Sequence, residues 1–283
     1  MNSRELQFVE AFKDKSESYL SRIDNELRME LNKYSNSPLY EPMKYVIEDG
    51  KRVRPLILLL STESIGISEE NPLPSAVAVE LLHTESIIHD DIIDQDATRR
   101  GRASFHARYG YNKSVLTADF VFGMILNIAS RYRNPRIARE LSIAALKMCE
   151  GEFKEMKINS ESKKISLDEY IYVVSHKTAS LFETSAKIGG ILGGGGEGEV
   201  SALAEYGLEL GIAYQIQDDI IDWNDINKLT KNIEIEPDEI QERLKEMSKI
   251  HAENAKKKLD ILGDGAAKEF LRELSDFSIH RQY

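Results

Sequence analysis

Residues 87–94 read Ile-Ile-His-Asp-Asp-Ile-Ile-Asp, and residues 215–222 read Gln-Ile-Gln-Asp-Asp-Ile-Ile-Asp. Both stretches hold the same five residues, Asp-Asp-Ile-Ile-Asp, inside runs that are otherwise largely apolar. Apolar residues around them recur at spacings of three and four, which is typical of helices, and the chain shows little alternation of period two. Only 7 prolines interrupt this pattern. The sequence therefore predicts an all-α protein.

The helical pattern extends along nearly the whole chain. We expect helices at about residues 3–32, 39–48, 54–65, 73–95, 112–130, 135–157, 167–191, 200–223, 237–262 and 265–280. No change in composition, flexible linker or fixed-period repeat marks a domain boundary, so residues 1–283 are predicted to form a single large helical domain. The glycine-rich stretch 189–198 follows a helix and lacks the pattern of a phosphate-binding loop, which favours an interhelical turn.

The composition excludes several classes of protein. Lys and Arg number 37 against 48 Asp and Glu, and the net charge of −11 argues against nucleic acid or an anionic membrane surface as the main partner. The single cysteine, Cys149, excludes a disulfide framework and a cysteine-based zinc site. The start of the chain lacks an apolar signal core, and the longest apolar runs, such as 55–60 and 121–126, are too short for an integral membrane segment. We expect a soluble cytoplasmic protein.

The two aspartate-rich stretches predict a metal site. On a helix, residues i and i+4 project from one face about 6 Å apart, so Asp90 pairs with Asp94, and Asp218 pairs with Asp222. A single pair of this kind usually belongs to a solvated helix face. Two copies within apolar helices are costly unless a cation binds the carboxylates, and oxygen ligands with few histidines nearby favour Mg²⁺ over Zn²⁺. Several Mg²⁺ ions held in this way would bind a strongly anionic ligand, and a diphosphate is the obvious choice.

The first of these helices carries a further polar group. His83, Ile87, Asp90 and Asp94 follow the spacing i, i+4, i+7 and i+11, so His83 lies on the same stripe about two turns deeper. A lone helical histidine is usually structural. On this stripe, a structural role and a ligand-binding role both remain open.

Basic residues flank the same helix in the sequence. Residues 50–55 read Gly-Lys-Arg-Val-Arg-Pro, residues 99–102 read Arg-Arg-Gly-Arg, and Lys177-Thr178 adds a cation and a hydroxyl within a helix of small residues. The planar fork of arginine matches phosphate oxygens. A solvated surface is the usual alternative for such clusters, but each of the first two adjoins a loop or a helix start, and the aspartate-bearing helix connects them.

With these motifs together, the sequence resembles the trans-polyprenyl diphosphate synthases, which are all-α enzymes that elongate isoprenoid chains. The matching stretches follow the order of the family and cover about residues 40–225; they are residues 50–55, 80–94, 99–101, 177–178 and 214–222. The resemblance implies a helical bundle of the isoprenoid synthase type with a central active-site cavity. It also implies a homodimer.

The resemblance further implies a reaction. An allylic prenyl diphosphate and isopentenyl diphosphate bind side by side, and Mg²⁺ at the two aspartate motifs draws off the allylic diphosphate to leave a carbocation. The isopentenyl double bond attacks this cation, and loss of a proton gives a product five carbons longer. No protein nucleophile is required. The expected product is a short-to-medium trans-prenyl diphosphate of C15 to C20, with geranylgeranyl diphosphate slightly favoured.

The family's functional positions can be carried over residue by residue. The metal ligands would be Asp90, Asp94, Asp218 and Asp222, with Asp91 and Asp219 inside the motifs. The positions that contact the allylic diphosphate match Arg99, Lys177, Thr178 and Gln215. The isopentenyl diphosphate site matches Lys51, Arg54, His83 and Arg100. The expected catalytic residues are Asp90, Asp91, Asp94, Lys177 and Asp218.

The sequence departs from the family after Asp222. Members usually carry a Gly-Lys and then a Gly-Lys-(Ser/Thr) loop, whose lysines close over the diphosphate, whereas residues 223–234 contain neither and leave Lys228 and Lys231 as candidate replacements. The alternative hypothesis is therefore a non-catalytic prenyl diphosphate-binding or regulatory subunit without the closing loop. A diphosphate hydrolase or a terpene cyclase is a third hypothesis, which the match to an isopentenyl diphosphate site disfavours. Gly151-Glu152 also replaces the usual Gly-Gln.

Product length depends on the residues just before the first motif. In the family, the positions four and five before it floor the pocket for the growing chain, and here they are Ser86 and Glu85. Ser86 is small enough to leave the path open, and helical rotation would turn Glu85 away from Asp90. In that case the next helix would close the tunnel, and its candidates are Phe120, Phe122 and Met124.

Overall fold

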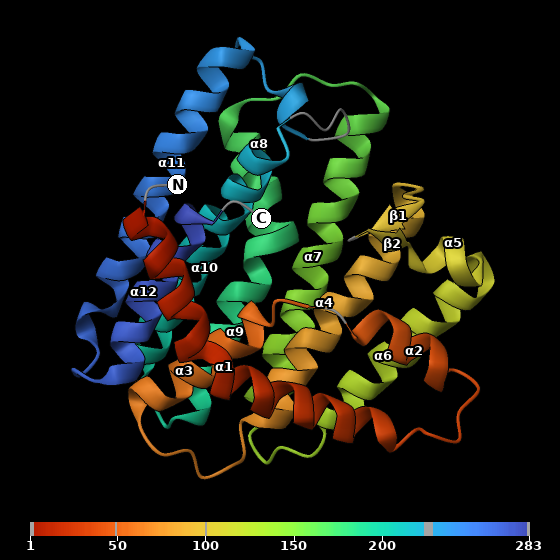
Figure 1. Cartoon of the computed structure of the whole chain (residues 1–283), viewed down its shortest axis with the longest axis vertical. Helices are drawn as coiled ribbons and strands as arrows, with labels where there is room; N and C mark the ends of the chain where they lie inside the picture. Colours follow the sequence, from red (N-terminus) through yellow and green to blue (C-terminus); the bar gives the residue numbers. More distant parts are fainter. Residues whose placement is uncertain (1–2, 49, 100, 224–228, 282–283) are drawn as a thin grey trace.

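A computed structural model describes residues 3–48, 50–99, 101–223 and 229–281, which form an all-α bundle as predicted (Figure 1). The α-helices are α1 (Ser3–Asn32), α2 (Tyr40–Ile47), α3 (Val53–Ile65), α4 (Leu73–Ile93), α5 (Phe105–Tyr109), α6 (Tyr111–Ala129), α7 (Arg136–Ser160), α8 (Leu167–Val174), α9 (Ser180–Leu192), α10 (Glu197–Ile221), α11 (Pro237–Lys258) and α12 (Ala266–His280). The shorter elements are the hairpin β1 (Thr98–Arg99) and β2 (Arg102–Ala103), the π-helical turn η1 (Ser175–Ala179), and the 3₁₀ turns η2 (Leu229–Asn232) and η3 (Leu259–Ile261).

The helices agree with the sequence prediction to within a few residues. The helix expected at 167–191 consists of α8, η1 and α9, and the helix expected at 237–262 consists of α11 and η3. The prediction missed α5 and the β1–β2 hairpin, which lie between two predicted helices. Both are too short for periodicity to reveal, and α5 begins at the N-cap Ser104, whose hydroxyl accepts a hydrogen bond from the backbone of Ala107.

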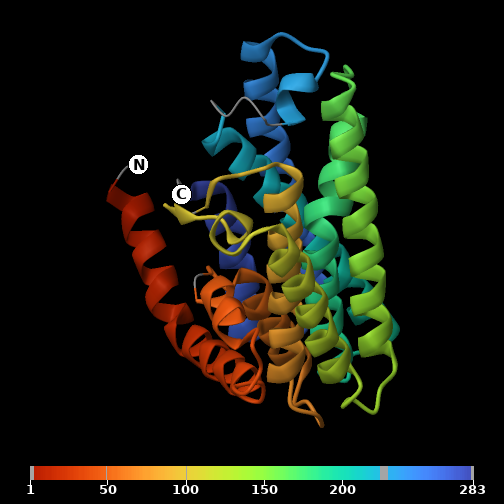
Figure 2. The same cartoon turned by 90° about the vertical axis from the view of Figure 1, so that its right-hand side faces the viewer.

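A central helix with an apolar surface on all sides organises the bundle. The run 56–60 of α3 is almost completely buried, with no residue more than 2% exposed, because α3 packs against α9 on one side and against α4 and α12 on others. The helix α10 packs in turn against α9 and α11, and α4 packs against α6. In the side view, α1 and α7 lie at opposite edges of the bundle (Figure 2).

The turn between α9 and α10 lies in the glycine-rich stretch, as predicted. Residue Gly194 in this turn has a φ of +79°, a conformation that residues with a Cβ atom rarely adopt. No helix in the described part of the chain is both long and apolar enough to cross a membrane.

Candidate active site

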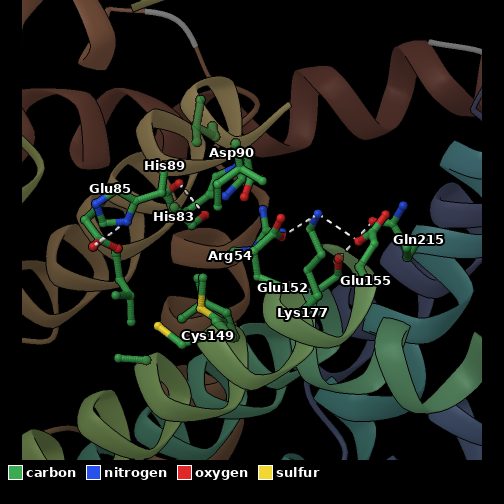
Figure 3. A pocket seen from close by; sticks show the side chains of 18 of the residues that line it. Arg54, His83, Glu85, His89, Asp90, Cys149, Glu152, Glu155, Lys177 and Gln215 are labelled. Carbon is green, nitrogen blue, oxygen red and sulfur yellow. Dashed lines mark hydrogen bonds and ion pairs between the residues drawn. The ribbon is translucent and has the colours of Figure 1, made fainter. Parts of the chain in front are cut away.

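A cavity of about 1250 Å³ opens between α4, α7, α10 and the turn η1. It collects most of the residues that the sequence singled out, from five separate segments of the chain (Figure 3). The predicted residues that line it are Lys51, Arg54, His83, Asp90, Asp94, Arg99, Lys177, Thr178, Gln215, Asp218 and Asp222. Arg100 lies outside the described residues. The cavity is therefore the candidate active site.

The outer aspartates of both motifs lie at the carboxyl ends of their helices. Asp94 is the C-cap residue of α4, and Asp222 is the C-cap residue of α10, with Asp90 and Asp218 one turn earlier. The carboxyl end of a helix carries partial negative charge, so it disfavours carboxylates unless a cation is present. Burial raises the pKa of Asp90, an effect that the cation of Lys177 opposes and the charge of Asp94 reinforces. The site thus concentrates negative charge that a bound cation would relieve.

The inner aspartates of the motifs have a different role. Asp91 is 1% exposed, forms an ion pair with Arg99 of the hairpin, and accepts a hydrogen bond from the backbone of Phe105 at 3.4 Å. Asp219 is 5% exposed and accepts hydrogen bonds from the Tyr170 hydroxyl at 2.7 Å and from Gln215 Nε2 at 2.9 Å. Both carboxylates are buried and hold neighbouring segments in place. Asp219 also lines the cavity, whereas Asp91, which was predicted to be catalytic, is not part of its lining.

The π-helical turn η1 delivers two predicted residues to the cavity. Lys177 and Thr178 both lie in this π turn, and both line the cavity. Turns of this kind inside α-helices are frequent at functional sites. The Thr178 hydroxyl donates a hydrogen bond to Gln215 Oε1 at 2.9 Å, which joins two residues predicted to contact the allylic diphosphate.

Two glutamates of α7 hold the Lys177 ammonium. Its Nζ atom lies 2.5 Å from Glu152 Oε2 and 2.8 Å from Glu155 Oε2, as the dashed lines in Figure 3 show. Burial lowers the pKa of Lys177, but the carboxylates of Glu155 and Asp90 outweigh burial and raise this pKa above its ordinary value. Burial together with the charge of Asp90 raises the pKa of Glu152 to about 7. In the sequence, Glu152 stands out only as a departure from the usual Gly-Gln, and no motif marks Glu155.

A further site residue comes from the end of the chain. Arg281 is 3% exposed, and its Nη1 atom lies 2.5 Å from Asp218 Oδ1. Its Nη2 atom donates to the backbone oxygen of Tyr214 at 2.6 Å, and the guanidinium lies 3.5 Å from the centre of the Tyr214 ring. No sequence motif marks this arginine, because its place beside the second aspartate motif depends on how α12 packs against α10.

The candidate replacements for the missing loop lysines are partly placed. Lys228 lies outside the described residues. The Nζ atom of Lys231 donates to the backbone oxygen of Trp223 at 2.9 Å and lies 4.9 Å from the centre of its ring. The Lys231 side chain therefore contacts Trp223, the residue that follows Asp222 at the end of α10.

The cavity continues away from the aspartates between α4, α6 and α7. Glu85 lines this part, and its Oε1 atom lies 3.1 Å from His89 Nδ1. The rotation that turns Glu85 from Asp90 therefore does not remove it from the cavity. The Ser86 hydroxyl is folded back onto the backbone oxygen of His83 at 2.9 Å.

Of the three candidates on the next helix, Phe122 lines the cavity. Met124 is 1% exposed within the core, and Phe120 packs edge-on against Tyr34 with ring centres 5.3 Å apart. Both side chains pack in the core and not on the cavity lining, so neither can close the tunnel.

Comparison with known proteins identifies the family. The family model described as polyprenyl synthetase matches residues 36–260. The chain is 31% identical to a geranylgeranyl diphosphate synthase of Methanosarcina mazei over 87% of this chain and 90% of that protein. It is 34% identical to a short chain isoprenyl diphosphate synthase of Methanocaldococcus jannaschii over 88% and 78%. The structure of a geranylgeranyl pyrophosphate synthetase from Pyrococcus horikoshii superposes with a TM-score of 0.82 at 28% identity, over 99% of this chain and 100% of that one.

The chain therefore belongs to the polyprenyl synthetase family, and its enzyme class is that of the trans-prenyl diphosphate synthases, as its motifs predicted. It is a prenyltransferase. The described fold, with its helical bundle and central cavity, agrees with this assignment.

Proposed function

We propose that this protein is a Mg²⁺-dependent enzyme that condenses an allylic diphosphate with isopentenyl diphosphate to give a trans-prenyl diphosphate of C15 to C20, with geranylgeranyl diphosphate slightly favoured. Residues 1–283 act as a single domain. The observation that carries the proposal is the convergence of two aspartate pairs, Lys177 and the basic loop 50–54 on the same cavity. The similarity over most of the chain to enzymes named as synthases argues against the non-catalytic alternative.

The donor set at the cavity suits Mg²⁺. The four outer aspartates offer only oxygen ligands, and Mg²⁺ is usually bound by one or two carboxylates together with phosphate oxygens and water. Within the described residues, no three His, Cys, Asp or Glu side chains are grouped so that they could hold a metal without further ligands. We therefore assign each aspartate pair a share of a site that the diphosphate of the substrate completes. Bound Mg²⁺ would offset the negative charge that develops on the departing diphosphate.

The cations of the chain divide between the two substrates. Lys177 and Arg99 lie with the aspartate motifs and would bind the allylic diphosphate, with Thr178 and Gln215 beside them. Lys51, Arg54 and His83 would bind isopentenyl diphosphate. The Arg54 guanidinium lies 4.6 Å from the centre of the Phe182 ring, which orients the planar fork.

The growing hydrocarbon tail would enter the part of the cavity between α4, α6 and α7. Ser86 precedes Asp90 by four residues of helix, or about 6 Å, so a tail anchored at the aspartates passes this small side chain first. The ion pair between Glu85 and His89 and the ring of Phe122 belong to the same lining. A charged pair is unfavourable beside a hydrocarbon, so these side chains would limit the product to a short or medium length.

We further propose that the protein is a cytoplasmic homodimer. Large apolar side chains are exposed along α6 and α7, including Leu116 at 59%, Leu126 at 56%, Leu146 at 64% and Phe153 at 63%. Large apolar side chains exposed on neighbouring helices are typical of a protein interface. Sedimentation at micromolar concentration would show a dimer, and Leu126→Glu would shift it towards the monomer. A monomeric wild type would refute the dimer.

Incubation with Mg²⁺, isopentenyl diphosphate and allylic primers of five, ten and fifteen carbons, followed by mass analysis of the products, tests the activity. We expect chain elongation that stops at C15 to C20. A folded sample that elongates no primer would refute the proposal. Binding without turnover, or turnover only with an added partner, would support the regulatory alternative, and release of inorganic diphosphate without elongation would indicate a hydrolase or cyclase.

A further inference from the structure

The basic loop ahead of α3 contains an arginine that differs from its neighbours. Lys51 is exposed and Arg54 is half-buried, and both line the cavity, as do Arg52 and Glu80. Arg52 between them is only 6% exposed and occupies the N-cap position of α3. Nothing in the substrate assignment above uses this buried arginine.

The guanidinium of Arg52 joins three helices. Its Nη1 atom donates to Glu80 Oε1 of α4 at 2.7 Å, and its Nε atom donates to Asp24 Oδ1 of α1 at 2.9 Å. Its Nη2 atom donates to the backbone oxygen of Ile47, the last residue of α2, at 2.6 Å. Each nitrogen of the group therefore has an acceptor on a different element. Only a planar fork with several donors can make this set of contacts.

The backbone around Arg52 is shaped to reach these contacts. Arg52 has a φ of +53°, a left-handed conformation that residues other than glycine rarely adopt and that surrounding contacts must stabilise. A Cβ atom on Gly50 would lie 2.2 Å from Arg52 Nη1 and 2.8 Å from Glu80 Oε1. The loop passes so close to the ion pair at position 50 that a side chain there would collide with it. The path of the chain is set on both sides of Lys51.

The ion pair also connects the loop to the helix that carries the rest of the site. Glu80 is 3% exposed and precedes His83 by three residues and Asp90 by ten on α4. Residues three apart on a helix are neighbours on its surface. If the loop 50–54 shifts where it contacts Glu80, the loop is therefore also displaced relative to His83. A buried ion pair is weak support for stability but can specify one arrangement of the segments that it joins.

We propose that Arg52, Glu80 and Asp24 are positioning residues for the isopentenyl diphosphate site: they hold the loop 50–54 in register with α4, so that Lys51 and Arg54 converge with His83 on one diphosphate. The inference rests on the proposed function for the identity of that ligand. None of the three residues is assigned contact with the substrate. Their loss would weaken the isopentenyl site and leave the allylic site, which is built from α4, η1 and α10, largely intact.

The test is Glu80→Gln, which keeps the shape of the side chain and removes its charge. Calorimetric titration with isopentenyl diphosphate should show binding weakened about tenfold or more, since small displacements of binding groups are costly. The same titration with the allylic diphosphate should give a dissociation constant within about twofold of the wild-type value. Arg52→Lys should behave in the same way, because one ammonium group cannot reach three acceptors. Asp24→Asn should have a smaller effect, since the Asp24 side chain is 46% exposed.

The chain offers a matched control for a purely structural role. Glu30 is 2% exposed and accepts two hydrogen bonds from Arg131, at 2.7 and 2.8 Å. Neither residue belongs to the described cavity lining. Glu30→Gln should lower the melting temperature by an amount similar to Glu80→Gln, with unchanged binding of isopentenyl diphosphate.

Two results would overturn the inference. One is a folded Glu80→Gln protein that binds isopentenyl diphosphate as the wild type does, and the other is an equal loss of affinity for both substrates. The proposed function is tested separately, by whether the wild type elongates a primer. Because the titration measures binding, a wild type that fails to elongate would still allow the variants to be compared.

Discussion

A single methyl group on α7 should displace the lysine at the centre of the site. Gly151 packs against the turn η1, and a Cβ atom built there would lie 2.4 Å from the backbone nitrogen of Lys177 and 2.9 Å from the carbonyl carbon of His176. Ordinary contacts begin at about 3.4 Å, so Gly151→Ala must separate α7 from η1 by about 1 Å. Both partners are backbone, so no side chain can rotate away.

The displacement carries Lys177 with it. Overpacking of this kind typically costs about 1–3 kcal/mol of stability, and a misplacement of about 1 Å at a catalytic group can cost about 10²-fold in rate. We expect Gly151→Ala to fold, to melt at a lower temperature, and to lose about 10²-fold in kcat/KM for the allylic diphosphate. The affinity for isopentenyl diphosphate should change little, because the contacts of Arg52 hold the loop 50–54 to α1, α2 and α4.

Steady-state kinetics with each substrate varied in turn would measure these changes, with circular dichroism to establish folding. The matched control is Gly198→Ala in the first turn of α10, where a Cβ atom would make an ordinary contact of 3.6 Å with Ile261. This variant should retain full activity and gain a few tenths of a kcal/mol, since alanine favours helices more than glycine does. Wild-type kcat/KM in Gly151→Ala would refute the argument that the backbone of η1 is tightly placed.

Three further predictions concern other parts of the cavity. The pKa of Glu152 is raised to about 7 in the folded protein, above its unfolded value of about 4.5, so the folded state holds this proton more tightly. Stability is therefore lost as the pH rises through this range, and in a chelator the melting temperature should fall between about pH 5 and pH 8. Glu152→Gln should reduce this dependence, and an identical pH profile would contradict the assignment. Arg281→Ala should lower the free energy of unfolding in urea by about 1–2 kcal/mol, because Asp218 loses its buried partner; an unchanged midpoint would be inconsistent with the pair. Glu85→Ala should lengthen the product seen by mass spectrometry, whereas an unchanged product would remove Glu85 from the tunnel floor.

The site could be predicted wherever helical geometry alone relates its residues. His83, Asp90 and Asp94 were placed on one stripe from their spacing, and the structure puts all three on the cavity lining. The same rule paired Asp218 with Asp222. Such predictions succeed because the rise and rotation of an α-helix are nearly constant, so that a spacing of four residues always returns to the same face.

The rule fails where the helix departs from constant geometry. The helix predicted at 167–191 is interrupted by the π turn that contains Lys177 and Thr178. No local signal in the sequence announces this turn. The hairpin β1–β2 was missed for a related cause, because two-residue strands leave no period to detect.

The chain's sequence was enough to establish the all-α class, most helix boundaries, the paired carboxylates and the family, because each depends on local spacing or on short motifs. The partners of those motifs were not accessible in this way. Glu152 and Glu155 around Lys177, Arg281 on Asp218, and the link from Arg52 to α1 and α4 join residues far apart in the chain. Their contacts arise when whole helices pack together, and helix packing depends on the volumes of many side chains at once, which no single stretch of sequence contains.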